Sequence, residues 1–253
     1  MARGFDDASS QGLRVTSAVV SAYPCTMACW FNSDDDAHSG KIMEVSNTST
    51  PAGDAWFMTA AGDVAGDPLR GYIRSATTIA FSVDTSTGFT AGTWHHACFV
   101  VTNSTSRTIY LDAGGAVTDS RASNFITGAD VTLIGRREQV GAIPANSYFS
   151  GNLAEGAIWN VALTAAGVAI LAKGYSPLLV RPQNLVAYWP MIRDTDDDIV
   201  GGFSMTPLNS PTIAAHPRVL YPIGPYMVPA AAAIAALRIP RHPAAYFGGP
   251  TIF

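Results

Sequence analysis

Residues 92–112 read Gly-Thr-Trp-His-His-Ala-Cys-Phe-Val-Val-Thr-Asn-Ser-Thr-Ser-Arg-Thr-Ile-Tyr-Leu-Asp. The stretch contains two short segments, 94–102 and 107–112, that are rich in β-branched and aromatic residues. Asn, Ser and Thr separate them, and these are turn residues. This composition predicts two β-strands with a turn between them. His95 and His96 are adjacent in the first strand, so we expect their side chains to point to opposite faces of a sheet.

Segments of the same kind recur on both sides of this stretch. Polar pieces rich in Ser, Thr, Asn, Asp and Gly separate them, and their regular spacing predicts an all-β sandwich or barrel. One short helix is expected after Thr164, which can cap its start, with Gly174 just beyond its end. The other predicted strands are 14–21, 25–32, 41–45, 55–59, 71–74, 78–83, 131–136, 148–159 and 185–191.

The charge composition excludes several classes of protein. Charged residues make up 13% of the 253 residues, and 15 basic against 19 acidic residues give a net charge of −4. A nucleic-acid binder is therefore not expected. No apolar run of signal-peptide length follows the N-terminus, and no run reaches the roughly 20 residues of a membrane helix. We accordingly expect neither a secretion signal nor a membrane partner.

Three cysteines, Cys25, Cys29 and Cys98, are an odd number for a disulfide framework. Cys25 and Cys29 lie on one face if their segment is a strand, and a small apolar thiol suits a sandwich core. The sequence therefore favours buried free thiols. A Cys29–Cys98 bridge between neighbouring strands stays open at this point.

The C-terminal part of the chain differs in composition from the rest. No Asp or Glu follows Asp198, and seven prolines fall between Pro217 and Pro250. Proline removes backbone donors, so this region cannot join the interior of a sheet. We expect a folded domain over 1–210 and an extended, proline-rich arm over 211–253 that binds a partner. The candidate partner-binding residues of the arm are Arg218, Tyr221, Tyr226, Arg238, Arg241, Tyr246, Phe247 and Phe253.

Several segments, in order, resemble the jelly roll of the laminin-G and pentraxin-type families in the concanavalin A-like lectin/glucanase superfamily. The resemblance covers roughly residues 5–200 and implies an antiparallel two-sheet jelly-roll sandwich with one short helix. Ala113 stands where the family's hairpin usually has Gly. The segments that carry the resemblance are 25–31, 92–100, 108–112, 133–135, 149–160, the short helix 163–171 and the closing strand 185–190.

The resemblance leaves the activity open, because such sandwiches serve as lectins, hydrolases and structural modules. Many laminin-G-like domains bind Ca²⁺ at loop ends, and Asp6, Asp7 or Asp194 could hold it here. Solvated turns are the favoured interpretation of the acidic clusters 34–36 and 194–198, and calcium is the alternative. Calcium is thus the one cofactor considered, and no other is implied.

No catalytic pattern is visible. The β-glucan hydrolases of this superfamily carry E-x-D-x-x-E on one strand, with carboxylates acting as nucleophile and acid. The chain's glutamates, Glu44, Glu138 and Glu155, have no partner at that spacing. For His95 and His96 we expect one hydrogen-bonded ring in the core and one at the surface. Sugar-stacking aromatics are harder to place; Trp56 and Tyr72 are candidates, whereas Trp30, Trp94, Trp159 and Trp189 are interpreted as packing.

Three hypotheses follow. The first is a non-enzymatic structural protein of a virus particle, of the capsid decoration or cement type, in a bacteriophage. Its arm would bind capsid or tail subunits or a second copy of the chain, in a virion assembled in the host cytoplasm. The second is a carbohydrate-binding module of a phage tail or adhesin, whose partner is a glycan. The third, a glycoside hydrolase, would need two carboxylates about 5–10 Å apart in a groove.

Overall fold

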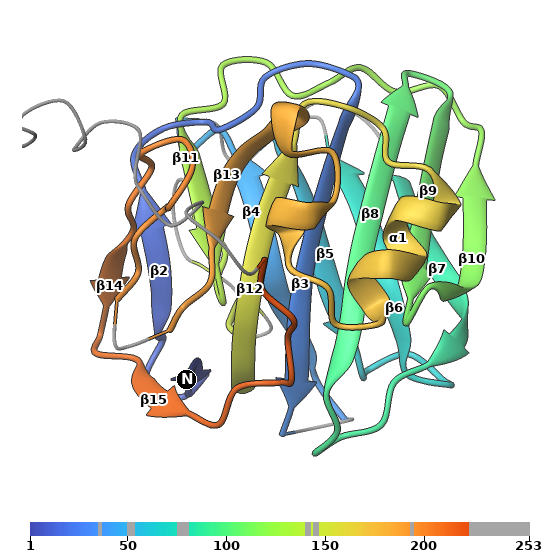
Figure 1. Cartoon of the computed structure of the whole chain (residues 1–253). Helices are drawn as coiled ribbons and strands as arrows, with labels where there is room; N and C mark the ends of the chain where they lie inside the picture. The colour runs from blue at the N-terminus through green and yellow to red at the C-terminus, as the bar shows by residue number, and fades with distance from the viewer. Residues whose placement is uncertain are drawn as a thin grey trace, which may run out of the picture. The chain divides into compact units, whose positions relative to one another are not determined.

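A computed structural model of the chain describes residues 1–34, 37–49, 54–74, 81–139, 143, 147–192 and 195–222. Within these residues two antiparallel sheets pack face to face, as Figure 1 shows. We refer to the first as sheet A. In spatial order its strands are β10 (Gly114–Asp119), β9 (Ser106–Leu111), β8 (His95–Asn103), β3 (Cys25–Ser33), β12 (Gly151–Trp159), β1 (Ala2–Phe5) and β15 (Thr212–Ala214), with β13 (Leu185–Trp189) also paired to β12.

The second sheet, sheet B, lies behind sheet A in Figure 1. Between β13 and the preceding sheet strand the chain forms one α-helix, α1 (Ala165–Ala172), and two short 3-10 helices, Pro177–Leu179 and Pro182–Asn184. The strands of sheet B in spatial order are β14 (Thr206–Leu208), β2 (Gly12–Val15), β11 (Val131–Ile134), β4 (Ser39–Ser46), β5 (Ala55–Ala61), β6 (Pro68–Arg74) and β7 (Phe81–Gly88).

The predicted all-β, two-sheet antiparallel sandwich with one short helix is confirmed. Four strands were not predicted: β1, β10, β14 and β15. Each is short or poor in β-branched residues, and β14 contains Pro207. Proline is tolerated there because β14 forms the edge of sheet B, where one side of the strand needs no partner.

The space between the sheets is filled by large apolar side chains from both of them. Met27 and Phe99 of sheet A and Trp56 of sheet B are fully buried in this core. Cys25 and Cys29 also point into it as free thiols, as predicted. The open alternative of a Cys29–Cys98 bridge is wrong, since all three thiols are free. The strand register pairs Cys98 with Ala28, one residue from Cys29, so the two sulfurs lie on opposite faces of sheet A.

A second apolar layer covers the outer face of sheet A. Helix α1 lies over β8 (Figure 1), and Val180 and Leu185 of the chain after it complete the layer. Trp159 on β12 is buried here, and its Nε1 donates to the carbonyl of Val180 at 2.8 Å. The buried residues of this layer are Ala28, Cys98, Val100, Ala157, Trp159, Leu163, Val168, Leu171, Val180, Leu185 and Tyr188.

The predicted start of α1 is confirmed, because the Thr164 hydroxyl accepts a hydrogen bond from the Gly167 amide at 3.2 Å. Replacing Thr164 with Ala should lower the free energy of unfolding by about 1 kcal/mol, since an orphan amide loses its acceptor. Chemical denaturation measures the change. Thr164→Ser keeps the oxygen and serves as control. Equal loss in both variants would contradict the capping role.

Strand β12 contains a bulge that turns one carboxylate outward. The register shifts between Ala154 and Ala157, and Glu155 has a positive φ of 58°. Strict alternation from the core residue Leu153 would point Glu155 between the two sheets. The extra residue of the bulge instead places Glu155 against Tyr188 in the outer layer of sheet A.

Glu155 is 2% exposed and binds three side chains. It accepts hydrogen bonds from the hydroxyls of Tyr188 and Tyr221, each at 2.5 Å. Nε2 of His216 lies 3.1 Å from its Oε1. Burial and the nearby charge of Glu155 raise the pKa of both tyrosines, so the phenols remain donors.

The first residues of the predicted arm therefore contact the domain itself. β15 pairs with β1 at the edge of sheet A, and His216 and Tyr221 bind Glu155. Leu220 also exchanges backbone hydrogen bonds with residues 174 and 176. Residues 223–253 lie outside the described part of the chain, so the role of the arm in binding a partner stays a prediction.

Two carboxylates of the acidic cluster at 194–198, those of Asp196 and Asp198, are not solvated as the sequence favoured, whereas Asp197 is exposed. Asp196 is buried and binds Arg3 through two oxygens, at 2.8 and 2.9 Å. Asp198 is buried too. Its carboxylate accepts hydrogen bonds from four backbone amides, those of Tyr188, Val200, Gly201 and Phe203. Both carboxylates are fixed by structural bonds, which a count of acidic residues cannot indicate.

Candidate functional site

The outer face of sheet B carries polar and aromatic side chains on three neighbouring strands. Along β6, Leu69, Gly71 and Ile73 face the core, so Arg70, Tyr72 and Arg74 face outward. β5 contributes Phe57 and Thr59 on the same face, opposite Tyr72 and Arg70. On β4 a register shift lies between Lys41 and Met43, with the result that both Lys41 and Glu44 belong to the outer face.

These side chains enclose a pocket of about 160 Å³. We call it the sheet-B pocket. It combines an aromatic pair with charged groups of both signs, the combination that orients small ligands in binding sites. Its lining residues are Ser39, Lys41, Phe57, Thr59, Asp63, Arg70, Tyr72, Arg74 and Arg137.

The aromatic floor of the pocket is ordered by stacking. Phe57 and Tyr72 are directly paired across β5 and β6, with ring centroids 4.6 Å apart and planes at 21°. The ammonium of Lys41 lies 5.1 Å from the centroid of the Phe57 ring, within cation–π range. Phe57 is buried by these contacts, whereas Tyr72 is only half-buried. Tyr72 is therefore the ring that a ligand can reach.

An ion pair and a hydrogen bond fix two of the polar walls. Arg70 on β6 forms a bidentate pair with Asp84 on β7, with Nε–Oδ1 at 2.6 Å and Nη2–Oδ2 at 2.7 Å. Ser39 donates to Asp63. Because two parallel hydrogen bonds to Asp84 hold the planar guanidinium of Arg70, this side of the pocket is preorganised.

A buried carboxylate lies next to the pocket. Glu44 has an exposed fraction of 0%, and its Oε2 has no hydrogen-bond partner among the described residues. Burial raises the pKa of Glu44 to about 7, although the charges of Arg137 and Lys41 oppose the rise. Burial likewise lowers the pKa of Lys41 to about 8, and Glu44 counteracts this. The net charge of the pocket therefore changes as the pH passes through the neutral range.

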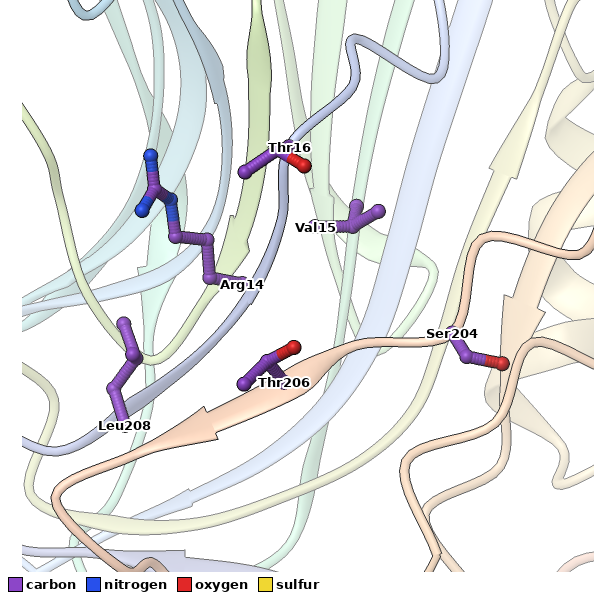
Figure 2. Close-up of a pocket in the computed structure, with 6 residues that line it drawn as sticks. All are labelled: Arg14, Val15, Thr16, Ser204, Thr206 and Leu208. Atoms are coloured by element: carbon purple, nitrogen blue, oxygen red, sulfur yellow. The ribbon is translucent and has the colours of Figure 1, made fainter.

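A second pocket, of about 190 Å³, lies along the β2–β14 edge of sheet B. Figure 2 shows Arg14, Val15 and Thr16 of the β2 segment on one side, facing Ser204 and the β14 residues. Nε of Arg14 lies 3.0 Å from Oε2 of Glu138. None of its described lining residues is aromatic, so they offer no stacking surface and fit a sugar less well than the sheet-B pocket does.

The predicted calcium residues do not form a metal site in what the structure describes. Asp6 accepts from the Ala8 amide at 3.0 Å and the Ser9 hydroxyl at 2.6 Å, and Asp7 accepts from the same amide at 2.8 Å. Asp194 lies outside the described residues. No group of three or more His, Cys, Asp or Glu side chains gathers in the described ranges. Calcium binding stays a prediction.

The arm candidates are only partly described. The Tyr221 hydroxyl is bound to Glu155, and Arg218 is exposed. The remaining candidates, Tyr226, Arg238, Arg241, Tyr246, Phe247 and Phe253, lie outside the described residues. In the part of the chain that is described, no helix has the length and apolar character needed to cross a membrane.

The two adjacent histidines point to opposite faces, as predicted. His96 is buried beside Trp30 on the outer side of sheet A, and burial lowers its pKa to about 4. The ring of His95 bonds Asp112 through Nδ1 at 2.7 Å and accepts from the Thr90 amide. His95 packs against the core residues Phe31 and Phe89, so the expected hydrogen-bonded ring on the core side is confirmed. The expectation that the other ring lies at the surface is wrong, because His96 is buried.

Of the two proposed aromatic platforms, only one is accessible. Trp56 is fully buried in the core, so that prediction is wrong, while Tyr72 lines the sheet-B pocket. Trp159 and Trp189 pack in the interior as interpreted. Four charged lining residues were not predicted: Lys41, Arg70, Arg74 and Arg137. The available signal was the alternation along 69–74, in which the polar or aromatic residues Arg70, Tyr72 and Arg74 alternate with Leu, Gly and Ile.

The amino-acid sequence matches the model of a known protein family. The model described as "Concanavalin A-like lectin/glucanases superfamily" matches residues 7–169, which is more than half of the chain. The chain therefore belongs to the concanavalin A-like lectin/glucanase superfamily, and its domain is lectin-like. A comparison with curated proteins finds no match.

Solved structures share the fold at low sequence identity. A heptameric pentraxin from Limulus polyphemus is 17% identical, with a TM-score of 0.52 over 64% of this chain and 75% of that one. Domain 4 of an extracellular arabinanase from Geobacillus stearothermophilus, in complex with arabinotriose, is 17% identical, with a TM-score of 0.50 over 64% and 72%. The CBM40 of a Ruminococcus gnavus sialidase, bound to α2,3-sialyllactose, is 9% identical, with a TM-score of 0.53 over 64% and 93%.

Proposed function

We propose that the domain is a non-enzymatic carbohydrate-binding module and that the sheet-B pocket is its glycan site. The observation that carries the proposal is the accessible Tyr72 ring between fixed polar walls. Sugars have apolar ring faces and hydroxyl-rich edges, so an aromatic ring beside charged donors and acceptors matches both. Two fold relatives whose structures contain arabinotriose or sialyllactose support this assignment.

The burial of Glu44 supports a binding role over hydrolysis. A retaining or inverting glycosidase needs two carboxyl groups that reach the scissile bond. Asp63 lines the pocket, but Glu44 is closed to solvent beneath it. Release of reducing ends from a glycan that binds the pocket would overturn this part of the proposal.

A glycan array followed by calorimetric titration tests the site. Tyr72→Ala should weaken binding of the best glycan about fivefold, because an aromatic stacking contact contributes roughly 1 kcal/mol. Tyr175→Ala is the matched control, since Tyr175 is exposed beyond α1 on the sheet A side. The proposal fails if no glycan is retained, or if the two variants bind alike.

The virion setting, its capsid or tail partners and the assembly in a host cytoplasm stay predictions. The comparisons give no support to a phage origin, and most of the arm on which that hypothesis depends lies outside the described residues. An adhesin or tail location for the glycan-binding module is equally untested.

A further inference from the structure

The charge lining the sheet-B pocket is opposite in sign to that of the whole chain. The chain has a net charge of −4, yet among the described residues the pocket is lined by four cationic side chains and one carboxylate, that of Asp63. Two further carboxylates border it: Asp84, paired with Arg70, and the buried Glu44. Four cations against three acids leave a formal charge of +1, even with Glu44 ionised.

Arg74 is where this excess charge is available. Among the described residues no hydrogen bond or ion pair uses its guanidinium, in contrast to the bidentate pair of Arg70. Arg74 lies two residues from Tyr72 on the same face of β6, a separation of about 6.7 Å along the strand. A sugar ring stacked on Tyr72 would therefore direct a substituent toward Arg74.

We propose that the sheet-B pocket selects sugars that carry an anionic group, carboxylate or sulfate, and that Arg74 and Arg137 bind this group. The inference rests on the proposed function, because it assigns the ligand class of the same site. Arginine suits the task, since its planar fork of donors matches a carboxylate or sulfate through two parallel hydrogen bonds.

The mutual repulsion of the cations supports this assignment. Burial lowers the pKa of Arg137; the charge of Glu44 opposes this effect, while that of Arg74 adds to it. Arg74 and Arg137 are therefore close enough for their charges to act on one another. Lys41 shows the same crowding, because the charges of Arg137 and Arg70 add to the burial that lowers its pKa. An anion between these groups would relieve the repulsion.

Paired neutral and anionic sugars of the same size test the inference on the full chain. The probes are lactose against 3′-sulfolactose, and galactobiose against digalacturonate, so sulfate and carboxylate are read separately. Calorimetric titration at neutral pH and low salt should show at least a tenfold preference for one anionic member over its neutral partner. Added salt should reduce the preference, as expected for partly exposed charges.

Substitution at Arg74 locates the effect. Arg74→Ala should abolish the preference, because the affinity for the anionic member should fall further than the affinity for its neutral partner. Arg218→Ala removes a charge from an exposed residue outside the pocket and should leave the preference intact.

Each result is decisive. Equal affinity for neutral and anionic members overturns the inference but leaves glycan binding standing, and a preference that survives Arg74→Ala overturns the assignment of Arg74. Failure to bind any of the four sugars, together with an empty glycan array, overturns both proposals.

Discussion

Replacing Glu155 with Ala is expected to lower the free energy of unfolding by about 3 kcal/mol. The substitution removes the acceptor of two phenol hydroxyls and the acidic partner of His216, all in a largely buried cluster. The hydroxyls of Tyr188 and Tyr221 would then lack an acceptor, and each unsatisfied buried donor is costly. Chemical denaturation of the variant measures the loss.

A local readout separates this effect from general damage to the fold. The backbone amide of Leu220 donates to the carbonyl of Gly174 at 2.7 Å, so its hydrogen exchange should accelerate in the variant. Glu138→Ala is the control, because Glu138 is partly exposed and its pair with Arg14 should contribute less than about 1 kcal/mol. If both variants lose equal stability and Leu220 stays protected, Glu155 does not hold this segment.

The affinity for a sulfated sugar should fall about thirtyfold from pH 6 to pH 9. Glu44 gains a negative charge as the pH passes its raised pKa of about 7. Lys41 then loses its positive charge as the pH passes its lowered pKa of about 8. Both changes make the pocket more negative, while sulfate stays ionised throughout. At an effective dielectric of about 20 and a separation of about 10 Å each change would cost roughly 1.7 kcal/mol, and screening by salt over about one Debye length reduces this to roughly 1 kcal/mol.

Two variants show which group causes each half of this pH dependence. Glu44→Gln should flatten the fall between pH 6 and pH 8, because the amide cannot ionise. Lys41→Met should flatten the part above pH 8. Arg137 faces both groups, and Arg70 and Asp63 face Lys41; both guanidiniums stay charged over this range. A flat wild-type profile, or an unchanged profile in Glu44→Gln, would show that these groups do not govern binding.

The fold could be predicted because its signals are local. Strands such as β3 and β8 are continuous runs of β-forming residues, and α1 begins at a residue that caps it through its own side chain. The missed strands β14 and β15 have weak local signals and exist because neighbouring strands offer free edges. The bulge at Glu155 also escaped prediction, since only the contacts of the folded sheet reveal it.

The candidate site was predicted only in part. Tyr72 was considered for stacking, but its stacking partner Phe57 comes from a neighbouring strand, and the sequence does not define the register of that pairing. Trp56 was a natural candidate by residue type, yet alternation along β5 places it in the core and Phe57 outside. Trp56 and Phe57 are neighbours on opposite faces of β5, so knowing which of the two faces the core would have reversed that choice.

Glycan binding at sheet B can be tested by mapping backbone amide chemical shifts while an array-selected glycan is titrated into the full chain. The account predicts the largest changes in 57–59 of β5, 70–74 of β6 and at Arg137. Saturable binding with changes confined to the β2–β14 edge, to the loop around Asp6 or to the outer face of sheet A would contradict it.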